Sequence, residues 1–193
     1  MDSVSYSLGV LFAQNFKNGE AINIDAASMA KGFEEAMKGK EVINVQNANM
    51  IFSKFMQEAQ QKKFLPVIEA GQKFLTENAK RPSVKTTASG LQYEVIKEGE
   101  GVMPKATDKV TVHYHGTLLN GKVFDSSVQR GQTIDFPVNG VIQGWQEALQ
   151  LMKVGSKYKL FIPYNLAYGE RGAGADIGPY ETLVFEVELF KIN

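Results

Sequence analysis

The sequence of 193 residues contains no cysteine. This absence excludes structural disulfides, thiol nucleophiles and cysteine-ligated zinc, and it leaves the redox compartment open. Neither sign of charge is in excess, since 21 lysines and arginines face 21 aspartates and glutamates and no block of like charge occurs. We therefore expect no nucleic-acid partner, because nucleic-acid binding requires a basic surface.

Long apolar runs are also lacking. No run approaches the ~20 residues that span a bilayer, and the first residues do not combine a basic start with an apolar stretch. With 44% apolar and 22% charged residues, the composition is that of an ordinary globular protein. We expect a soluble protein without a membrane span, located in the cytoplasm or, if a signal peptide has been removed, in the periplasm or cell envelope.

Common catalytic signals are scarce. The two histidines, His113 and His115, could bind a transition metal, but no third ligand is evident, so two surface histidines without a metal are the preferred interpretation. No Gly-x-Ser-x-Gly motif supports hydrolase chemistry. The glycine-rich stretch 169–175 lacks the Lys-Ser/Thr ending of a phosphate loop and leads toward a strand, which indicates a turning loop beside a pocket. We expect neither a metal nor a cofactor.

The first half of the chain has helical periodicity. Apolar residues recur every three to four positions in 8–16, in 29–37 and in a longer stretch from about 47 to 80. Asp25 is placed to cap the second helix, and Gly39 to end it. These patterns predict an all-α region.

The third helix is long for a packed domain and contains Pro66. An interior proline removes a backbone donor, so a kink or break is expected near Gln61–Leu65. Two short helices cannot cover the apolar face of so long a helix, and a second copy of the chain is the simplest partner. The alternative is that these residues pack onto the C-terminal domain. Residues 81–90 resemble a helix end and linker, which predicts domains at 1–82 and 83–193.

After Gly90 the apolar period changes to two. Alternation in 110–118, in 157–162 and in 182–189 predicts half-buried antiparallel strands. One short helical stretch, Trp145–Met152, carries its apolar residues on one face and could lie across such a sheet. The predicted fold class is α+β, with an antiparallel sheet and a short helix after an all-α region.

Five segments in this half resemble the FKBP family of prolyl isomerases: VHYHGTL (112–118), GKVFDSS (121–127), VIQGW (141–145), LAYG (166–169) and TLVFEVEL (182–189). The resemblance implies a sheet wrapped around a short helix. The N-terminal stretches 4–9 and 30–33, with the long helix, resemble the dimerisation region of bacterial FKBPs of the macrophage-infectivity-potentiator type. That likeness implies a homodimer whose N-terminal regions intertwine and hold the isomerase domains apart in a V.

The family's pocket can be carried over residue by residue. The resemblance implies catalytic roles for Tyr114, Asp125, Tyr168 and Phe185, and substrate-binding roles for Phe124, Arg130, Phe136, Val141, Ile142, Trp145 and Ile177. Three positions depart from the common pattern. Ile134 replaces an aromatic residue found in some members, and Ala173 and Asp176 stand where bulkier or apolar residues are common.

The implied reaction is rotation about an X-Pro amide, whose resonance makes the barrier ~18–20 kcal/mol. No bond is made or broken, so an apolar pocket that favours the less polar, twisted amide suffices. Trp145 is expected to form the floor, and Tyr168 to donate a hydrogen bond to a substrate carbonyl. Asp125 needs a partner, either Arg130 or the Tyr114 hydroxyl, and could orient the pocket or stabilise the twisted carbonyl.

The implied partners are proline-containing unfolded or partly folded proteins and macrolide inhibitors of the tacrolimus and rapamycin type, with chaperone activity as a V-shaped dimer. The alternative function is a dimeric holdase with a vestigial isomerase pocket. The acidic Asp125 beside Trp145 argues against the alternative, since a pocket kept only for packing needs no acid. Because every pocket residue lies after Gly90, we expect residues from about Ser89 onward to fold alone.

Overall fold

The protein is described by a computed structural model that covers residues 2–18 and 24–193, apart from the side chains of residues 16–18 and 60. The chain forms two compact units, Met1–Lys63 and Phe64–Asn193. The boundary between them lies inside a helix, upstream of the division at residues 82 and 83. That division of function stays a prediction.

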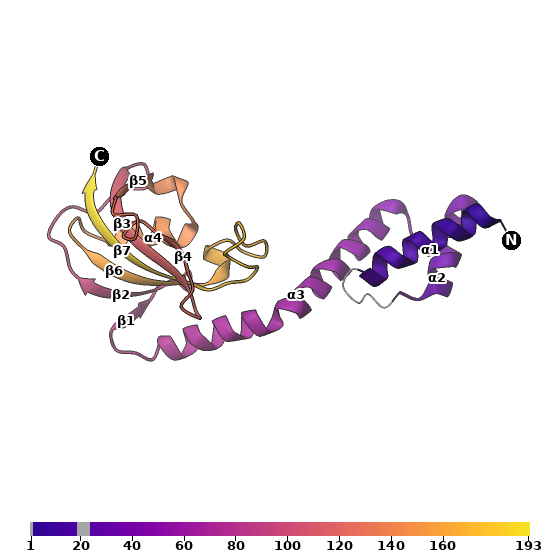
Figure 1. Cartoon of the computed structure of the whole chain (residues 1–193), viewed down its shortest axis with the longest axis horizontal. Coiled ribbons are helices and arrows are strands. Elements are labelled where there is room, and N and C mark those ends of the chain that lie inside the picture. Colours follow the sequence, from indigo (N-terminus) through magenta and orange to yellow (C-terminus); the bar gives the residue numbers. More distant parts are fainter. Residues whose placement is uncertain (1, 19–23) are drawn as a thin grey trace. The chain divides into compact units, whose positions relative to one another are not determined.

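The first unit is helical, as expected. Its helices are α1 (Ser3–Asn18), α2 (Ala26–Met37) and the first part of α3 (Val45–Asn78) (Figure 1). The carboxylate of Asp25 accepts a hydrogen bond from the Ser28 N–H at 2.7 Å, which confirms the predicted N-cap. Gly39 follows α2 with φ +63°, a conformation suited to glycine and typical of a helix end. The side chain of Asn44 caps α3 by accepting a hydrogen bond from the Asn47 N–H at 2.8 Å.

Helix α3 is continuous through Pro66, so a break near Gln61–Leu65 does not occur, whereas a kink there stays a prediction. The boundary between the two compact units nevertheless falls within that stretch, between Lys63 and Phe64. Over residues 2–18 and 24–193, no helix combines the length and apolar character that crossing a bilayer requires.

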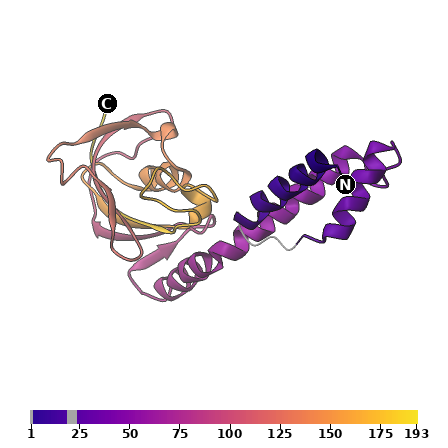
Figure 2. The same cartoon turned by 45° about the vertical axis from the view of Figure 1, so that its right-hand side comes forward.

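The second unit contains an antiparallel sheet in the order β1-β2-β6-β7-β3-β4, with β5 paired to β3. Its strands are β1 (Val84–Thr86), β2 (Gln92–Lys97), β3 (Lys109–Leu118), β4 (Val123–Ser126), β5 (Ile134–Pro137), β6 (Lys157–Ile162) and β7 (Leu183–Ile192). Three short helices interrupt them: η1 (Val138–Gly140), α4 (Gln143–Leu151) and η2 (Tyr164–Leu166). The sheet curves around α4 (Figure 2), which confirms the α+β fold expected.

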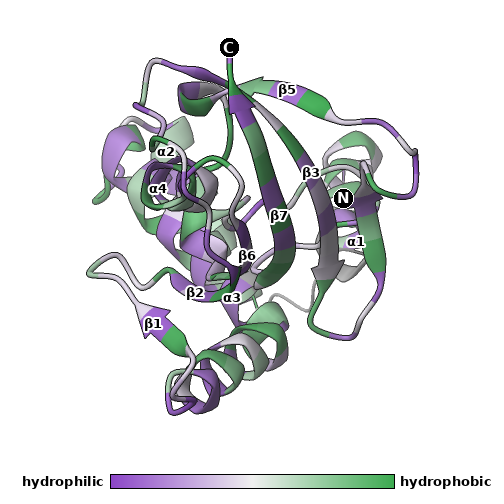
Figure 3. Ribbon diagram, turned by 90° about the vertical axis from the view of Figure 1, so that its left-hand side faces the viewer, coloured by the Kyte–Doolittle hydropathy of each residue, from purple (hydrophilic) through white to green (hydrophobic). Residues whose placement is uncertain are grey.

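The core lies between α4 and the concave face of the sheet. Hydrophobic and hydrophilic residues alternate along β7 (Figure 3), and Leu183, Phe185, Val187 and Leu189 are all buried. Their neighbours Val184, Glu186 and Glu188 point to the other face, as the pleat of a strand requires. The two-residue period read in the sequence therefore corresponds to one buried and one outer face.

The last turns of α3 pack on the outer face of this sheet. The ring of Phe74 lies 5.7 Å from that of Phe161 on β6. The buried Asn78 amide donates a hydrogen bond to the Gln92 side chain at 2.9 Å, and Gln92 donates to the Leu75 carbonyl at 2.8 Å. The end of α3 therefore belongs structurally to the second unit.

Candidate active site

Trp145 is the centre of an aromatic cluster on the concave face of the sheet. Its indole lies edge-on to three rings, with centroid distances of 5.4 Å to Tyr114, 5.9 Å to Phe136 and 5.2 Å to Phe185. Edge-to-face packing at these distances is favourable for aromatic pairs. Trp145 is only 4% exposed, and its Nε1 has no hydrogen-bond partner among the described residues. Burying an indole N–H without a hydrogen-bond partner costs free energy. A phenylalanine would pack in this place without that cost.

A close approach of two further rings depends on Gly116 in the middle of β3. The rings of Phe124 and Phe185 meet edge-on at 5.3 Å beside this glycine. A Cβ at position 116 would lie 2.7 Å from Phe124 and 2.8 Å from Phe185, so no larger residue fits without displacing the pocket wall. Gly116 was not predicted as a site residue, although a glycine inside a strand pattern is a signal for such an approach.

Asp125 lies at the edge of the cluster and has both of the partners considered from the sequence. The Tyr114 hydroxyl donates a hydrogen bond to one carboxylate oxygen, and the Arg130 guanidinium donates to the other. Arg130 also donates to the Tyr114 hydroxyl oxygen at 3.0 Å. The side chains of Asp125 and Arg130 are 43% and 47% exposed, so the network lies at the protein surface beside the aromatic cluster.

These contacts shift the acidities of the groups at the pocket. Burial raises the pKa of Asp125, but the hydrogen bonds from Tyr114 and Arg130 outweigh it and hold the pKa below its ordinary value. Burial, and then the hydrogen bond to Asp125, raise the pKa of Tyr114. Burial also raises the pKa of Tyr168, and the negative charge of Asp125 adds to this effect. The carboxylate is thus ionised and both phenols are protonated at neutral pH.

Two serines that follow Asp125 form hydrogen bonds with residues of β3. The Ser127 Oγ accepts a hydrogen bond from the Tyr114 N–H at 2.8 Å and lies 2.9 Å from Nδ1 of His113. Nδ1 of His115 lies 3.0 Å from the Ser126 Oγ. Both histidines are partly buried and lie within hydrogen-bond distance of serines, and the described residues contain no group of three or more side chains that could hold a metal ion.

The remaining predicted pocket residues surround this centre. Val141 and Ile142, which lead into α4, are partly buried and pack against the core, as do Phe124 and Phe136. Ile177 is 8% exposed and belongs to the core cluster. Tyr168 is 40% exposed and lies at the rim.

The three departures from the family pattern have different surroundings. Ile134 and Ala173 pack against the core cluster. Asp176 is exposed and forms an ion pair with Lys122 at 2.8 Å.

Both halves of the chain match models of known protein families. Residues 100–190 match the family model described as FKBP-type peptidyl-prolyl cis-trans isomerase. Residues 1–95 match the model described as the domain amino terminal to FKBP-type peptidyl-prolyl isomerase.

Similar proteins extend over the whole chain. The FKBP-type 22 kDa peptidyl-prolyl cis-trans isomerase of Escherichia coli is 46% identical over 97% of this chain and 93% of its own length. The outer membrane protein MIP of Legionella longbeachae is 41% identical over 100% of this chain and 85% of its own. The crystal structure of FkpA from Escherichia coli has a TM-score of 0.67 at 34% identity and covers 98% of this chain and 95% of that one. The chain therefore belongs to the FKBP-type peptidyl-prolyl cis-trans isomerases, in the FkpA and Mip group that carries an N-terminal helical domain.

Proposed function

We propose that the aromatic cluster around Trp145 is the pocket in which this isomerase twists the X-Pro bond. The observation that carries this proposal is the indole ring, buried edge-on among three other rings beside the network of Tyr114, Asp125 and Arg130. Apolar rings accept a proline ring, and one polar edge interacts with the amide.

Catalysis follows from the change in polarity along the reaction. The planar amide is stabilised by resonance that places partial charges on nitrogen and oxygen, and twisting the bond removes that resonance. Water stabilises the polar planar form, so transfer to an apolar pocket lowers the free energy of the twisted amide relative to the planar one. The proline ring lies over Trp145, and Phe124, Phe136, Val141, Ile142 and Phe185 exclude water.

Two polar groups orient the substrate. Tyr168 is protonated and half exposed at the rim, so its hydroxyl can donate a hydrogen bond to a substrate carbonyl. Asp125 is ionised, and its two hydrogen bonds fix the direction of its charge. A fixed negative charge at the pocket edge acts on the substrate carbonyl without the reorganisation that water would need.

Clients and inhibitors follow from the shape of this site. The substrates are proline-containing segments of unfolded or partly folded proteins, because the pocket recognises a proline ring and its preceding carbonyl. Macrolides of the tacrolimus and rapamycin type compete for the same rings. We expect such a macrolide to inhibit peptide isomerisation by the unmodified chain, and an unchanged rate at saturating macrolide would contradict a shared site.

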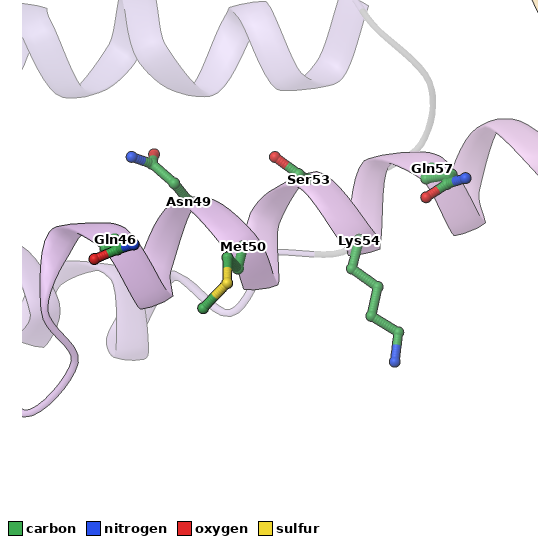
Figure 4. Close-up of a pocket in the computed structure, with 6 residues that line it drawn as sticks. All are labelled: Gln46, Asn49, Met50, Ser53, Lys54 and Gln57. Atoms are coloured by element: carbon green, nitrogen blue, oxygen red, sulfur yellow. The ribbon is translucent and has the colours of Figure 1, made fainter.

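The N-terminal helices assemble two chains into a dimer. No described side chain of the first unit is buried, and Leu8, Phe33 and Met37 are 63%, 70% and 74% exposed. A hollow of about 480 Å³ lies along α3. The side chains that line it all come from that single helix (Figure 4): Gln46, Asn49, Met50, Ser53, Lys54 and Gln57. Apolar exposure of this extent is typical of a surface that pairs with another protein, and a second copy supplies equivalent helices.

Sedimentation of three variants tests this dimer. Leu8→Asp and Phe33→Asp place a charge on the apolar faces and should yield monomers at concentrations where the unmodified chain is dimeric. Gln14→Asp is a matched control on α1 and should leave the dimer intact. A monomeric unmodified chain at micromolar concentration contradicts the proposal.

A second activity, holding unfolded proteins as a chaperone, is favoured by the same exposed apolar helices. A dimer raises the effective concentration of pockets near one client. Suppression of aggregation and acceleration of proline-limited refolding separate the two activities. Asp125→Leu should slow refolding without reducing suppression of aggregation, and a holdase with a vestigial pocket would show no effect of this substitution on either.

The compartment is part of the same proposal. Relatives of this chain come from bacteria, and one of them is named an outer membrane protein. We place this protein in a bacterial cell, in the envelope if its natural form carries a signal peptide and otherwise in the cytoplasm. Fractionation of cells that produce the natural form decides between the two.

A further inference from the structure

The segment between η2 and β7 carries Tyr168 near its start and Ile177 near its end. Both the backbone N–H and the backbone carbonyl of Gly169, the residue after Tyr168, are hydrogen-bonded. Its N–H donates to the Tyr164 carbonyl at 2.9 Å, and its carbonyl accepts a hydrogen bond from the Tyr180 N–H, also at 2.9 Å. The backbone at Tyr168 therefore depends on Tyr180.

Tyr180 has an unusual conformation for its residue type. Among the described residues it is the one non-glycine with positive φ, at 62°, and its side chain is 1% exposed. A bulky side chain is disfavoured in this region of backbone space, so such a residue persists only where its surroundings hold it. Outliers of this kind cluster at functional sites.

Two rings hold the Tyr180 ring in place. Tyr164 from η2 packs edge-on against it at 5.2 Å, and Phe64 from α3 packs at 5.7 Å. Helix α3 approaches the end of the same segment closely, because a Cβ on Gly71 would lie 2.5 Å from the Oγ1 of Thr182. The base of the segment is thus clamped between the helix and η2.

We propose that Tyr180 is a positioning residue of the isomerase site, whose ring, clamped by Phe64 and Tyr164, sets the backbone of Gly169 and hence the direction of Tyr168. The proposal depends on the role of Tyr168 given under the proposed function. The proposal also gives a role to α3 from Phe64 onward, which supports the segment between η2 and β7 in addition to linking the two units of the chain.

Substitution of Tyr180 in the full chain tests this assignment. Tyr180→Asn removes the ring and keeps a residue that tolerates positive φ. We expect kcat/KM for a short X-Pro peptide to fall about 10- to 100-fold per folded protein, the size of effect that a misplaced catalytic group produces. Tyr180→Phe keeps the ring and should retain activity. Wild-type kcat/KM in Tyr180→Asn would overturn the proposal.

Two further variants separate positioning from a loss of stability. Phe64→Ala removes the ring on α3 and should lower kcat/KM in the same direction, which keeps the proposal testable if Tyr180→Asn does not fold. Phe74→Ala removes a ring from the same helix that contacts Phe161 instead. It should lower the unfolding midpoint and leave kcat/KM of the folded protein unchanged. Equal losses of kcat/KM in both alanine variants would contradict the assignment.

A double-mutant cycle identifies the residue through which Tyr180 acts. In a Tyr168→Ala background, Tyr180→Asn should cause no further loss of kcat/KM, because the side chain it positions is gone. If the losses of kcat/KM in the two single variants multiplied in the double variant, Tyr180 would not act through Tyr168 and its role would be structural only. Wild-type activity of Tyr168→Ala alone would refute the role of Tyr168, whereas an impaired Tyr168→Ala with an unimpaired Tyr180→Asn would refute only the positioning.

Discussion

The Tyr114 hydroxyl donates a hydrogen bond to Asp125 while the backbone N–H of the same tyrosine donates to Ser127 two residues later. Tyr114 therefore fixes both the carboxylate and the backbone that carries it, and its ring packs edge-on against Trp145. The polar network and the aromatic cluster are therefore joined through this one side chain.

Replacing Asp125 should separate activity from stability. Asp125→Leu removes the charge without opening a cavity, and Asp125 is 43% exposed, so we expect only a small fall in the unfolding midpoint from the loss of its hydrogen bonds. The loss of a fixed charge at the reacting amide should lower kcat/KM about 10- to 1,000-fold. Peptide assays and urea unfolding of the same preparation measure both. A collapsed midpoint with normal activity of the folded fraction would make Asp125 a structural residue.

The acidity of Asp125 predicts how stability depends on pH. Its pKa lies below the ordinary value of 3.8 in the folded protein, because its hydrogen bonds outweigh its burial. Such a group contributes stability above its unfolded pKa and loses that contribution as pH falls through its folded pKa. The difference in unfolding free energy between the unmodified chain and Asp125→Asn should be constant above about pH 5 and shrink below it. Urea titrations of both proteins at several pH values measure this difference. If the difference stayed constant down to acidic pH, the lowered pKa of Asp125 would not contribute to stability.

Trp145→Ala should reduce both catalytic activity and folding stability. The residue is 4% exposed and contacts three rings, and truncation of a buried aromatic residue costs about 3–5 kcal/mol. Trp145→Phe should restore part of the stability, since an aromatic ring still fills most of the space. Thermal unfolding and peptide assays are the measurements. An unchanged melting temperature in Trp145→Ala would contradict its placement in the core.

The contacts made by the last turns of α3 predict a more stable isomerase fragment than one that starts at Ser89. A chain that starts at Ser89 lacks β1 and Asn78, and it exposes Phe161, which α3 covers in the intact protein. A fragment 64–193 retains all of these contacts. We expect it to be a folded, active monomer, and a fragment 89–193 to unfold at lower urea concentration. Equal midpoints for the two fragments would show that the end of α3 adds nothing to the fold.

The alternation of apolar residues was sufficient to predict the strands around Val110–Leu118 and Leu183–Leu189, because each has one face in the core. Capping of α2 by Asp25 was predictable for a similar reason, since a local side-chain hydrogen bond needs only local sequence. The candidate pocket residues come from motif resemblance and not from periodicity. By pattern alone Trp145 and Phe185 are indistinguishable from ordinary core residues.

Long-range packing accounts for what was not predicted. The hydrogen bond between Asn78 and Gln92 joins a helix to a strand, and nothing in either local sequence marks it. Nothing in the sequence indicated the positive φ of Tyr180, because tyrosine does not favour this conformation. A kink or break was expected near Pro66, and the helix continues through it without a break, because packing of the following turns on the sheet stabilises it.

Isomerisation of a short X-Pro peptide by the purified full chain tests the central claim most directly. In a protease-coupled assay the protein should accelerate the cis-to-trans step above the thermal rate, in proportion to its concentration, and Asp125→Leu should lose most of that acceleration. The thermal rate with folded, unmodified protein, or equal acceleration by the variant, would contradict the assignment of catalysis to the pocket around Trp145.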